Sequence, residues 1–218
     1  MNCQAQRQSD EMFCAKCNKR WDLDGDPVEC HGAAQSVPLL IGLSGAAGSG
    51  KSTAAEYLTE EYGYRRLRFA GPLKDAMRRI LRAACLDNHT IERMIEGDMK
   101  ETPHPALMGK TPRHAMQTLG TEWGRNCLHG DFWVNLTQYA IQSMPVGTRI
   151  VIEDVRFDNE AAMIRSLGGK IIRMEGRGGI GGSHPSEQGV IPDMTCYNGG
   201  SLHETHRWFD YALTLTKR

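Results

Sequence analysis

The 218-residue chain has no long apolar run, no excess of either charge and few aromatic residues. No stretch approaches the ~20 apolar residues that cross a bilayer, and the polar first ten residues lack the apolar core of a secretion signal. Lysine plus arginine and aspartate plus glutamate number 26 each, so bulk charge gives no reason to expect binding to nucleic acid or to an anionic membrane. The sequence therefore predicts a cytoplasmic protein with no membrane partner.

The seven cysteines are an odd number, which does not suit a full disulfide framework. Cys14 and Cys17 form a C-x-x-C pair, and Cys30 follows with His31 beside it. Thiolates at this spacing can hold two corners of a tetrahedral Zn²⁺ site. We predict a small zinc knuckle within residues 1–35, with Cys14, Cys17 and Cys30 as ligands and either His31 or Cys3 as the fourth. Because a second C-x-x-C is missing, a reduced segment without metal is the alternative.

Residues 45–52, GAAGSGKS, fit the phosphate-binding pattern G-x-x-x-x-G-K-[ST]. An apolar run precedes them at 37–43 and an amphipathic segment follows at 53–62, which is the strand–loop–helix context of this motif. Its glycines let main-chain N–H groups face an anion, and the helix adds its positive N-terminal dipole. Lys51 is placed for the β- and γ-phosphates of a nucleotide and Ser52 for Mg²⁺. The alternative, a helix cap that binds nothing, would need neither side chain.

Strand and helix patterns alternate after this loop. Apolar segments at 64–69, 150–152 and 170–174 predict short strands, with helical spacing between them. This order predicts an α/β P-loop domain over residues 36–218, in which a mainly parallel sheet is flanked by helices. Ligands of such sheets bind at the carboxyl ends of the strands, where Asp154 is also expected.

Helix starts are marked by local signals. Proline at a first turn marks Gly71-Pro72 and Thr111-Pro112, and Asp131 is expected to cap the helix that follows it. A capping box from Ser201 to Glu204 predicts a final helix.

Asp154 ends a hydrophobic strand, as an acid does when it helps to hold hydrated Mg²⁺ beside a phosphate loop. Arg156 stands two residues further on, so both side chains point to one side if the strand continues. A carboxylate and a guanidinium in one cleft suit the neutralisation of a phosphate. The alternatives are a strand-end cap for Asp154 and a weak surface ion pair for Arg156.

Arg113, Gln117, Thr121 and Arg125 recur at about helical spacing, although the helix could break at Gly120. Two arginines and a glutamine on one face can grip a phosphate and a base edge. A solvated helix face is an equally good interpretation of the spacing alone.

Two further features could belong to a nucleotide site. Trp123 and Trp133 could stack on a base, or could simply be core residues. Arg173 and Arg177 flank or lie in a glycine-rich stretch, which predicts a lid over about residues 175–200, with a plain surface loop as the alternative.

Several blocks together resemble the deoxynucleoside monophosphate kinases of tailed bacteriophages, in the P-loop kinase superfamily. The resemblance covers residues 37 to about 205, and its most distinctive blocks are T-P-R…Q-T-L-G-T-E-W-G-R (111–125) and D-V-R-F-D-N-E (154–160). Members often carry Asp at the position of Ser52.

The resemblance implies three sets of site residues. The ATP phosphates would be held by Gly48, Gly50, Lys51, Ser52 and Thr53. The acceptor pocket, on helices of about residues 72–143, would be shaped by Arg68, Lys74, Arg113, Gln117, Gly120, Thr121, Trp123, Trp133 and Asp154. The reacting centre would contain Lys51, Asp154 and Arg156.

The predicted activity is the ATP- and Mg²⁺-dependent phosphorylation of a deoxynucleoside 5′-monophosphate, in the host cytoplasm if a phage encodes the chain. One alternative is a P-loop kinase for another phosphate acceptor, such as dephospho-coenzyme A. A second, of another class, is a nucleotide switch or nucleic-acid-binding module that reads through the zinc knuckle. The sequence leaves open the preferred base and the oligomeric state, a homodimer included.

Overall fold

The computed structural model describes residues 5–8, 11–14, 20–22, 39–178 and 190–215. Its first strands, β1 (Ala5–Gln8), β2 (Glu11–Cys14) and β3 (Arg20–Asp22), form an antiparallel sheet of their own. Among the predicted zinc ligands, Cys14 ends β2, whereas Cys3, Cys17, Cys30 and His31 lie outside the described residues. The zinc knuckle therefore stays a prediction.

A five-stranded sheet forms the centre of the remaining chain. Its order is β5 (Arg65–Leu67), β6 (Ile150–Ile152), β4 (Leu40–Ser44), β7 (Lys170–Glu175) and β8 (Met194–Tyr197). Every neighbouring pair is parallel, which confirms the predicted α/β architecture. All five carboxyl ends consequently meet at one edge, where the phosphate loop follows β4.

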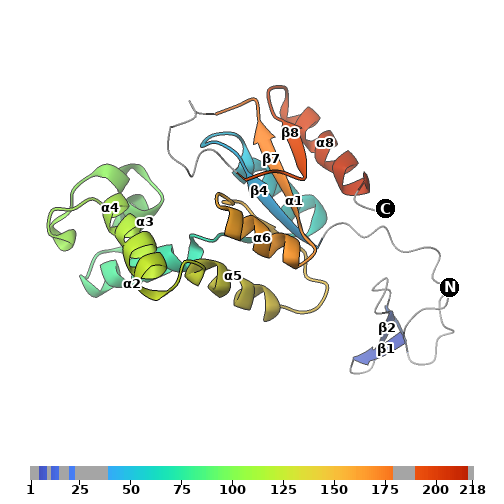
Figure 1. Cartoon of the computed structure of the whole chain (residues 1–218), viewed down its shortest axis with the longest axis horizontal. Coiled ribbons are helices and arrows are strands. Elements are labelled where there is room, and N and C mark those ends of the chain that lie inside the picture. The colour runs from blue at the N-terminus through green and yellow to red at the C-terminus, as the bar shows by residue number, and fades with distance from the viewer. Residues whose placement is uncertain (1–4, 9–10, 15–19, 23–38, 179–189, 216–218) are drawn as a thin grey trace.

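Helices cover both faces of this sheet (Figure 1). On one face α1 (Lys51–Tyr62) and α8 (Leu202–Leu215) bury a core with the inward side chains of β4 and β7. On the other face α6 (Asp158–Ser166), with α5 (Phe132–Gln142) beside it, buries a second core. Because the sheet is covered on both sides, the central strands β4 and β6 are buried along their whole length, which confirms the buried strand predicted at Ile150–Ile152.

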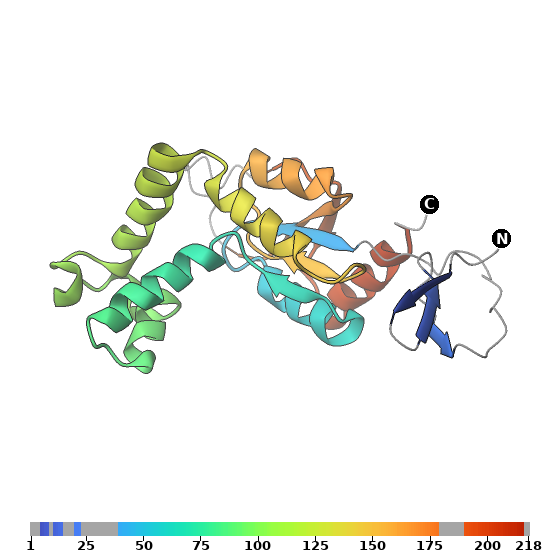
Figure 2. The ribbon, with the colours of Figure 1, turned by 90° about the horizontal axis from the view of Figure 1, so that it is seen from below.

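A helical lobe projects from the sheet (Figure 2). It contains α2 (Gly71–Ala83), α3 (Asn88–Ile95) and α4 (Pro112–Gln117), with the short 3₁₀ turns η1 (Asp98–Glu101) and η2 (Pro105–Leu107). The lobe has its own apolar core, formed by Met77, Leu81, Ile91, Met94 and Ile95. Helices within the predicted acceptor-binding range are thus placed as a unit beside the carboxyl edge of the sheet.

Most of the predicted helix starts are confirmed. The Thr111 hydroxyl accepts a hydrogen bond from the His114 N–H (3.1 Å), and Ser201 with Glu204 forms the reciprocal capping box. Asp131 is an exception, because it makes no side-chain cap to α5. Its carboxylate instead accepts a hydrogen bond from the Asn159 amide (2.7 Å), which ties the start of α5 to α6.

The predicted lid was wrong in two respects. Met194–Tyr197 is the edge strand β8, and Arg173 lies within β7, where its guanidinium donates to the Val190 carbonyl. Residues 179–189 lie outside the described residues. Arg177 as a lid residue stays a prediction; its guanidinium donates to the carbonyl of Gly200. In the described ranges, no helix is both long and apolar enough to span a membrane.

Candidate active site

The phosphate loop turns sharply from β4 into α1. Gly45, Gly48 and Gly50 all have positive φ, of 132°, 76° and 95°. A side chain at Gly50 would be strained by its backbone and would also place a Cβ 2.2 Å from the Asn198 amide nitrogen. Since Gly50 immediately precedes the first turn of α1, the loop presents main-chain N–H groups and the helix dipole in one direction.

Lys51 reaches back across this loop. Its ammonium donates to the carbonyls of Gly45 (2.7 Å) and Ala46 (2.6 Å). Burial, followed by the nearby positive charge of Arg156, lowers the pKa of Lys51 below its ordinary value. An anionic ligand would favour the charged form of Lys51. It would also take the place of the carbonyl oxygens that the ammonium contacts here.

The segments that follow β7 and β8 pack against the phosphate loop and support it. The Asn198 amide donates to the Ser49 carbonyl (3.0 Å) and accepts from the Thr205 hydroxyl (2.7 Å). Gly178 packs so closely that a Cβ there would lie 2.4 Å from the Ala47 carbonyl oxygen. No sequence pattern selects Asn198, because its role depends on where β8 places it.

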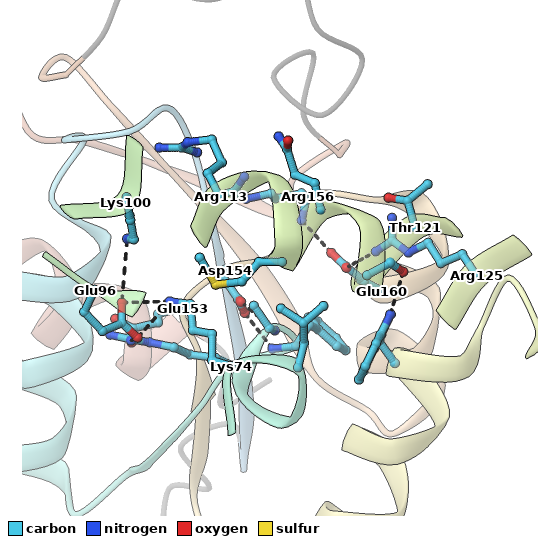
Figure 3. A pocket seen from close by; sticks show the side chains of 18 of the residues that line it. Lys74, Glu96, Lys100, Arg113, Thr121, Arg125, Glu153, Asp154, Arg156 and Glu160 are labelled. Atoms are coloured by element: carbon cyan, nitrogen blue, oxygen red, sulfur yellow. Dashed lines mark hydrogen bonds and ion pairs between the residues drawn. The ribbon is translucent and has the colours of Figure 1, made fainter. Parts of the chain in front are cut away.

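A cavity of about 490 Å³ opens between the phosphate loop, the carboxyl ends of β5 and β6, and the helical lobe. We call it the central cavity (Figure 3). Predicted site residues that line it are Lys51, Ser52, Arg68, Lys74, Arg113, Gln117, Gly120, Thr121, Trp133, Asp154 and Arg156. Residues from segments about a hundred positions apart are thus brought into one space.

The other predicted site residues lie elsewhere. Gly48, Gly50 and Thr53 belong to the phosphate loop and the first turn of α1 but do not line the central cavity. Trp123 is 45% exposed and packs edge-on against Phe132, so it does not form the cavity wall that was predicted for it.

Positive charge dominates the central cavity. Among its described lining residues, seven are Lys or Arg and four are Asp or Glu, although the whole chain is neutral. The cavity therefore attracts anions by a local distribution of charge that the composition conceals.

Asp154 lies in the middle of the cavity wall (Figure 3). Its two carboxylate oxygens accept hydrogen bonds from the main-chain N–H groups of Phe69 (2.8 Å) and Ala70 (3.0 Å). Burial raises the pKa of Asp154, while these two N–H groups oppose that rise. Asp154 thus holds the turn that begins α2 against β6, and each oxygen keeps a lone pair for a further ligand.

Glu153, the preceding residue, organises the arginines of β5 and the turn after it. Its carboxylate, only 4% exposed, forms ion pairs with Arg68 and with Arg66 (2.8 Å for the latter). Burial alone would raise the pKa of Glu153, but the hydrogen bonds from Arg68 and Arg66 hold it below its ordinary value. The acidic end of the strand was the sequence signal for this residue.

Glu160 provides a second buried carboxylate, which lies on the other side of Asp154 from Glu153 (Figure 3). It accepts hydrogen bonds from the N–H groups of Arg156 (2.7 Å) and Phe157 (3.0 Å), and Arg125 lies 3.4 Å from its other oxygen. The Arg125 guanidinium also stacks 4.0 Å from the Phe157 ring centre. No hydrogen bond or ion pair within the described residues uses the Arg156 guanidinium, which leaves it available to an anion.

The wall that carries Gly120, Thr121 and Arg125 is η3 (Thr118–Leu128), a π-helix that continues α4. The sequence analysis allowed for a helix break at Gly120, but the helical conformation continues through this residue. The Trp133 indole instead donates to the Gly120 carbonyl (2.8 Å) and packs against Gly124, where a Cβ would lie 2.5 Å from the indole nitrogen. Trp133 is 6% exposed, so it supports the cavity wall from behind while its edge reaches the cavity.

The site fits a nucleotide with Mg²⁺ in its donor chemistry. The loop presents its main-chain N–H groups at the start of α1, and Ser52 and Asp154, which both line the central cavity, offer the oxygen ligands that Mg²⁺ prefers. Within the described part of the chain, no group of three or more His, Cys, Asp or Glu side chains is arranged to hold a metal by itself.

A phosphate loop that opens α1 and a cationic cavity at the carboxyl edge of a parallel sheet together define a P-loop kinase. Comparison with known proteins narrows this class. Residues 109–207 match the family model described as "Deoxynucleotide monophosphate kinase". The protein named "Putative deoxynucleotide monophosphate kinase" of Acanthamoeba polyphaga mimivirus is 36% identical over 163 residues, 68% of this chain and 80% of that protein. The chain belongs to the deoxynucleotide monophosphate kinase family.

Two further proteins show weaker similarity. The "Deoxynucleoside-5'-monophosphate kinase" of Escherichia phage T5 is 33% identical over 88 residues, 37% of this chain and 35% of that enzyme. The crystal structure of TT1252 from Thermus thermophilus matches 83% of this chain and 98% of its own, with a TM-score of 0.43 and 16% identity.

Proposed function

We propose that this protein transfers the γ-phosphoryl group of ATP to the 5′-phosphate of a deoxynucleoside monophosphate. One observation carries the proposal: a single cationic cavity joins Lys51 and Ser52 of the phosphate loop to Arg113, Gln117 and other residues of the helical lobe. A donor at the loop and an acceptor against the lobe would therefore face each other. Membership of the kinase family supports the same reaction and favours neither alternative considered from the sequence.

In the reaction, an oxygen of the acceptor phosphate forms a bond to the γ-phosphorus while the bond from that phosphorus to the β,γ-bridging oxygen breaks. The products are a deoxynucleoside diphosphate and ADP. The attacking phosphate is already ionised, so the protein need not supply a strong general base. Catalysis then depends on alignment and on neutralising negative charge.

Each end of the central cavity has residues suited to one of these tasks. Lys51, and Arg156 whose guanidinium is available, would stabilise charge on the transferring group. Ser52 and Asp154 would hold Mg²⁺, which when bound neutralises the nucleotide phosphates. Asp154 also fixes the turn at Phe69 and Ala70, which sets the position of α2.

The acceptor would lie against the lobe. Arg68, Lys74 and Arg113 supply the cations for its phosphate, and Gln117 and Thr121 supply polar groups for its sugar or base. Trp133 holds the wall on which these polar groups are carried.

The deciding experiment is a coupled assay of ADP release with a panel of acceptors. The panel contains the four common deoxynucleoside monophosphates, their ribonucleotide counterparts and dephospho-coenzyme A. We expect ADP release only with one or more deoxynucleoside monophosphates. Turnover with dephospho-coenzyme A alone, or hydrolysis of ATP that DNA stimulates without any acceptor, would refute the proposal.

We further propose, from the cysteine spacing alone, that residues 1–35 bind one Zn²⁺ through Cys14, Cys17 and Cys30, with His31 or Cys3 completing the site. Elemental analysis of the purified chain tests this directly. About one zinc per chain is expected, and its loss in Cys17→Ser would locate it; a zinc-free preparation would refute it.

A further inference from the structure

Glu96 lines the central cavity, and its carboxylate is surrounded by positively charged side chains. It follows the last turn of α3, and its carboxylate lies between Lys74 and Lys100 in Figure 3. Both carboxylate oxygens lie within 2.9 Å of the Lys74 ammonium. Arg68 (3.5 Å), Arg78 (3.4 Å) and Lys100 (3.9 Å) complete the surroundings. Four cations around one anion is the arrangement expected of a bound phosphate.

We propose that Glu96 is the resident counter-anion of the acceptor-phosphate subsite, which neutralises Lys74, Arg68 and Lys100 in the free enzyme and is displaced from them by the incoming phosphate. The inference rests on the proposed function, because it concerns the acceptor of that reaction. Glu96 thereby sets the affinity for the acceptor and keeps weaker anions out of the subsite.

The two glutamates that contact Arg68 differ in how easily a ligand could replace them. Glu153 is 4% exposed and lies beneath the arginines, so it is a permanent partner. Both carboxylates line the central cavity, but the Glu96 side chain is 33% exposed. Because Glu96 is the more exposed of the two, a ligand in the cavity can displace it more easily, and water can solvate this carboxylate once it is displaced.

Glu96 also carries its charge at neutral pH. Burial would raise its pKa, but the hydrogen bond from Lys74 and the charges of Lys74, Arg68 and Lys100 hold the pKa below its ordinary value. The same side chain cannot hold Lys74 through both oxygens and leave this ammonium to a phosphate. Phosphate therefore competes with Glu96 for Lys74. Only an anion with a greater charge than the carboxylate, or a better fit to these cations, displaces it.

The alternative role for Glu96 is positioning, in which it orients Lys74 and Arg68 for the acceptor and stays in place. The two roles predict opposite signs. Removing a competitor tightens acceptor binding, whereas removing a positioning residue weakens it.

The test compares Glu96→Gln with Glu92→Gln. Glu92 is on the same helix and also holds Arg78 (2.7 and 2.9 Å), but it does not line the cavity. Each variant thus removes one carboxylate from Arg78, and only Glu96→Gln removes a charge from the cavity. Sulfate binding is measured by calorimetry without nucleotide, and KM is measured for the best acceptor of the panel.

For Glu96→Gln we expect sulfate to bind about five- to tenfold more tightly and the acceptor KM to fall by a similar factor. Glu92→Gln should stay within twofold of the parent protein in both. Glu96→Asp, which draws the carboxylate back while keeping its charge, should shift both values in the same direction by a smaller factor, and serves if Glu96→Gln fails to fold.

Unchanged or weaker sulfate binding in a folded Glu96 variant would overturn the proposal, as would a raised acceptor KM. Because sulfate binding needs no turnover, this outcome is separate from the outcome of the acceptor panel. A parent protein that phosphorylates no deoxynucleoside monophosphate would refute the function and still leave the competition at Glu96 measurable.

Discussion

Lys51 is a side chain that we expect to be important for turnover but to contribute little to the stability of the fold. Among the described residues, its ammonium bonds only to oxygens of the phosphate loop, at Gly45, Ala46 and Ser49. We expect Lys51→Ala to lower kcat at least 10²- to 10³-fold, because charge on the transferring group loses its nearest cation. The midpoint of thermal unfolding should change little.

Lys170→Ala is the matched control for Lys51→Ala, since Lys170 is exposed on β7 and does not line the central cavity. Steady-state kinetics with saturating ATP and acceptor should show parental turnover for this control. If Lys51→Ala also turned over at a near-parental rate, Lys51 would have no part in the mechanism.

We expect Glu160 to make the stability of the fold depend on pH. Burial, its largest influence, raises the pKa of Glu160 to about 7, although the N–H groups of Arg156 and Phe157 and the charge of Arg125 act in the opposite direction. An acid whose pKa is raised by folding contributes its stability fully below its unfolded pKa, and this stability is lost as pH rises through about 7. The shift corresponds to about 3 kcal/mol.

Glu160→Gln should therefore remove a fall of about 3 kcal/mol in the free energy of unfolding between pH 4.5 and pH 8. Urea unfolding at intervals across this range measures it. Glu122→Gln, at an exposed position of η3, should reproduce the parental pH profile. Coincident profiles for Glu160→Gln and the parent would show that Glu160 keeps an ordinary pKa.

The residues that sequence could select were those inside a local pattern. Lys51, Ser52, Asp154 and Arg156 all belong to recognisable blocks, and the structure places all four in one cavity. Glu96, by contrast, acquires its role only because the packing of α3 on α2 brings it to Lys74, 22 positions away. No spacing rule reports such a partner.

At the scale of elements, the π-helix η3 is the feature that most directly shapes the acceptor side. Gly124 has no room for a side chain, because a Cβ would lie 2.5 to 2.9 Å from three atoms of the Trp133 indole. We expect Gly124→Ala to push Trp133 from its place and break its hydrogen bond to the Gly120 carbonyl. Overpacking of this kind costs about 1–3 kcal/mol.

The acceptor KM of Gly124→Ala should rise more than the KM for ATP, since Gly120 and Thr121 lie on the displaced wall. Gly130→Ala is the control, because a Cβ there would meet nothing within 4 Å. Unfolding curves and the two KM values give the comparison. Equal effects on ATP and acceptor would mean that η3 does not shape the acceptor side specifically.

The strand β8 and the π-helix η3 were not predicted, for identifiable reasons. The strand β8 has one buried residue, Cys196, so its sequence shows neither an apolar run nor a clear alternation. The π-helix depends on contacts from Trp133, more than ten positions from Gly120, and a glycine alone suggests a break. The strands β4 and β6 were found because both faces of the sheet are covered, which makes them buried runs of mostly apolar residues, and β7 was found from its buried Ile171, Ile172 and Met174.

At the scale of the whole molecule, the residues of the central cavity are concentrated in one part of the chain. The residues that line the central cavity all lie between Lys51 and Glu160, and the loop that precedes them begins at Gly45. The antiparallel sheet of β1, β2 and β3 shares no strand pairing with the five-stranded sheet. A neutral chain thus carries a cationic cavity within a little more than half of its length, so overall charge was a poor guide to its ligand.

A chain that begins at Val37 should consequently retain the activity. Where the structure describes the chain, the residues that form both cores of the five-stranded sheet and the core of the lobe all lie from Leu40 onward. We expect kcat and both KM values to stay within twofold of those of the full chain, with similar unfolding by urea. The comparison uses the same acceptor panel for both chains. A drop of tenfold or more in kcat/KM for the acceptor, in a shortened chain that unfolds cooperatively, would mean that the first 36 residues contribute to the site.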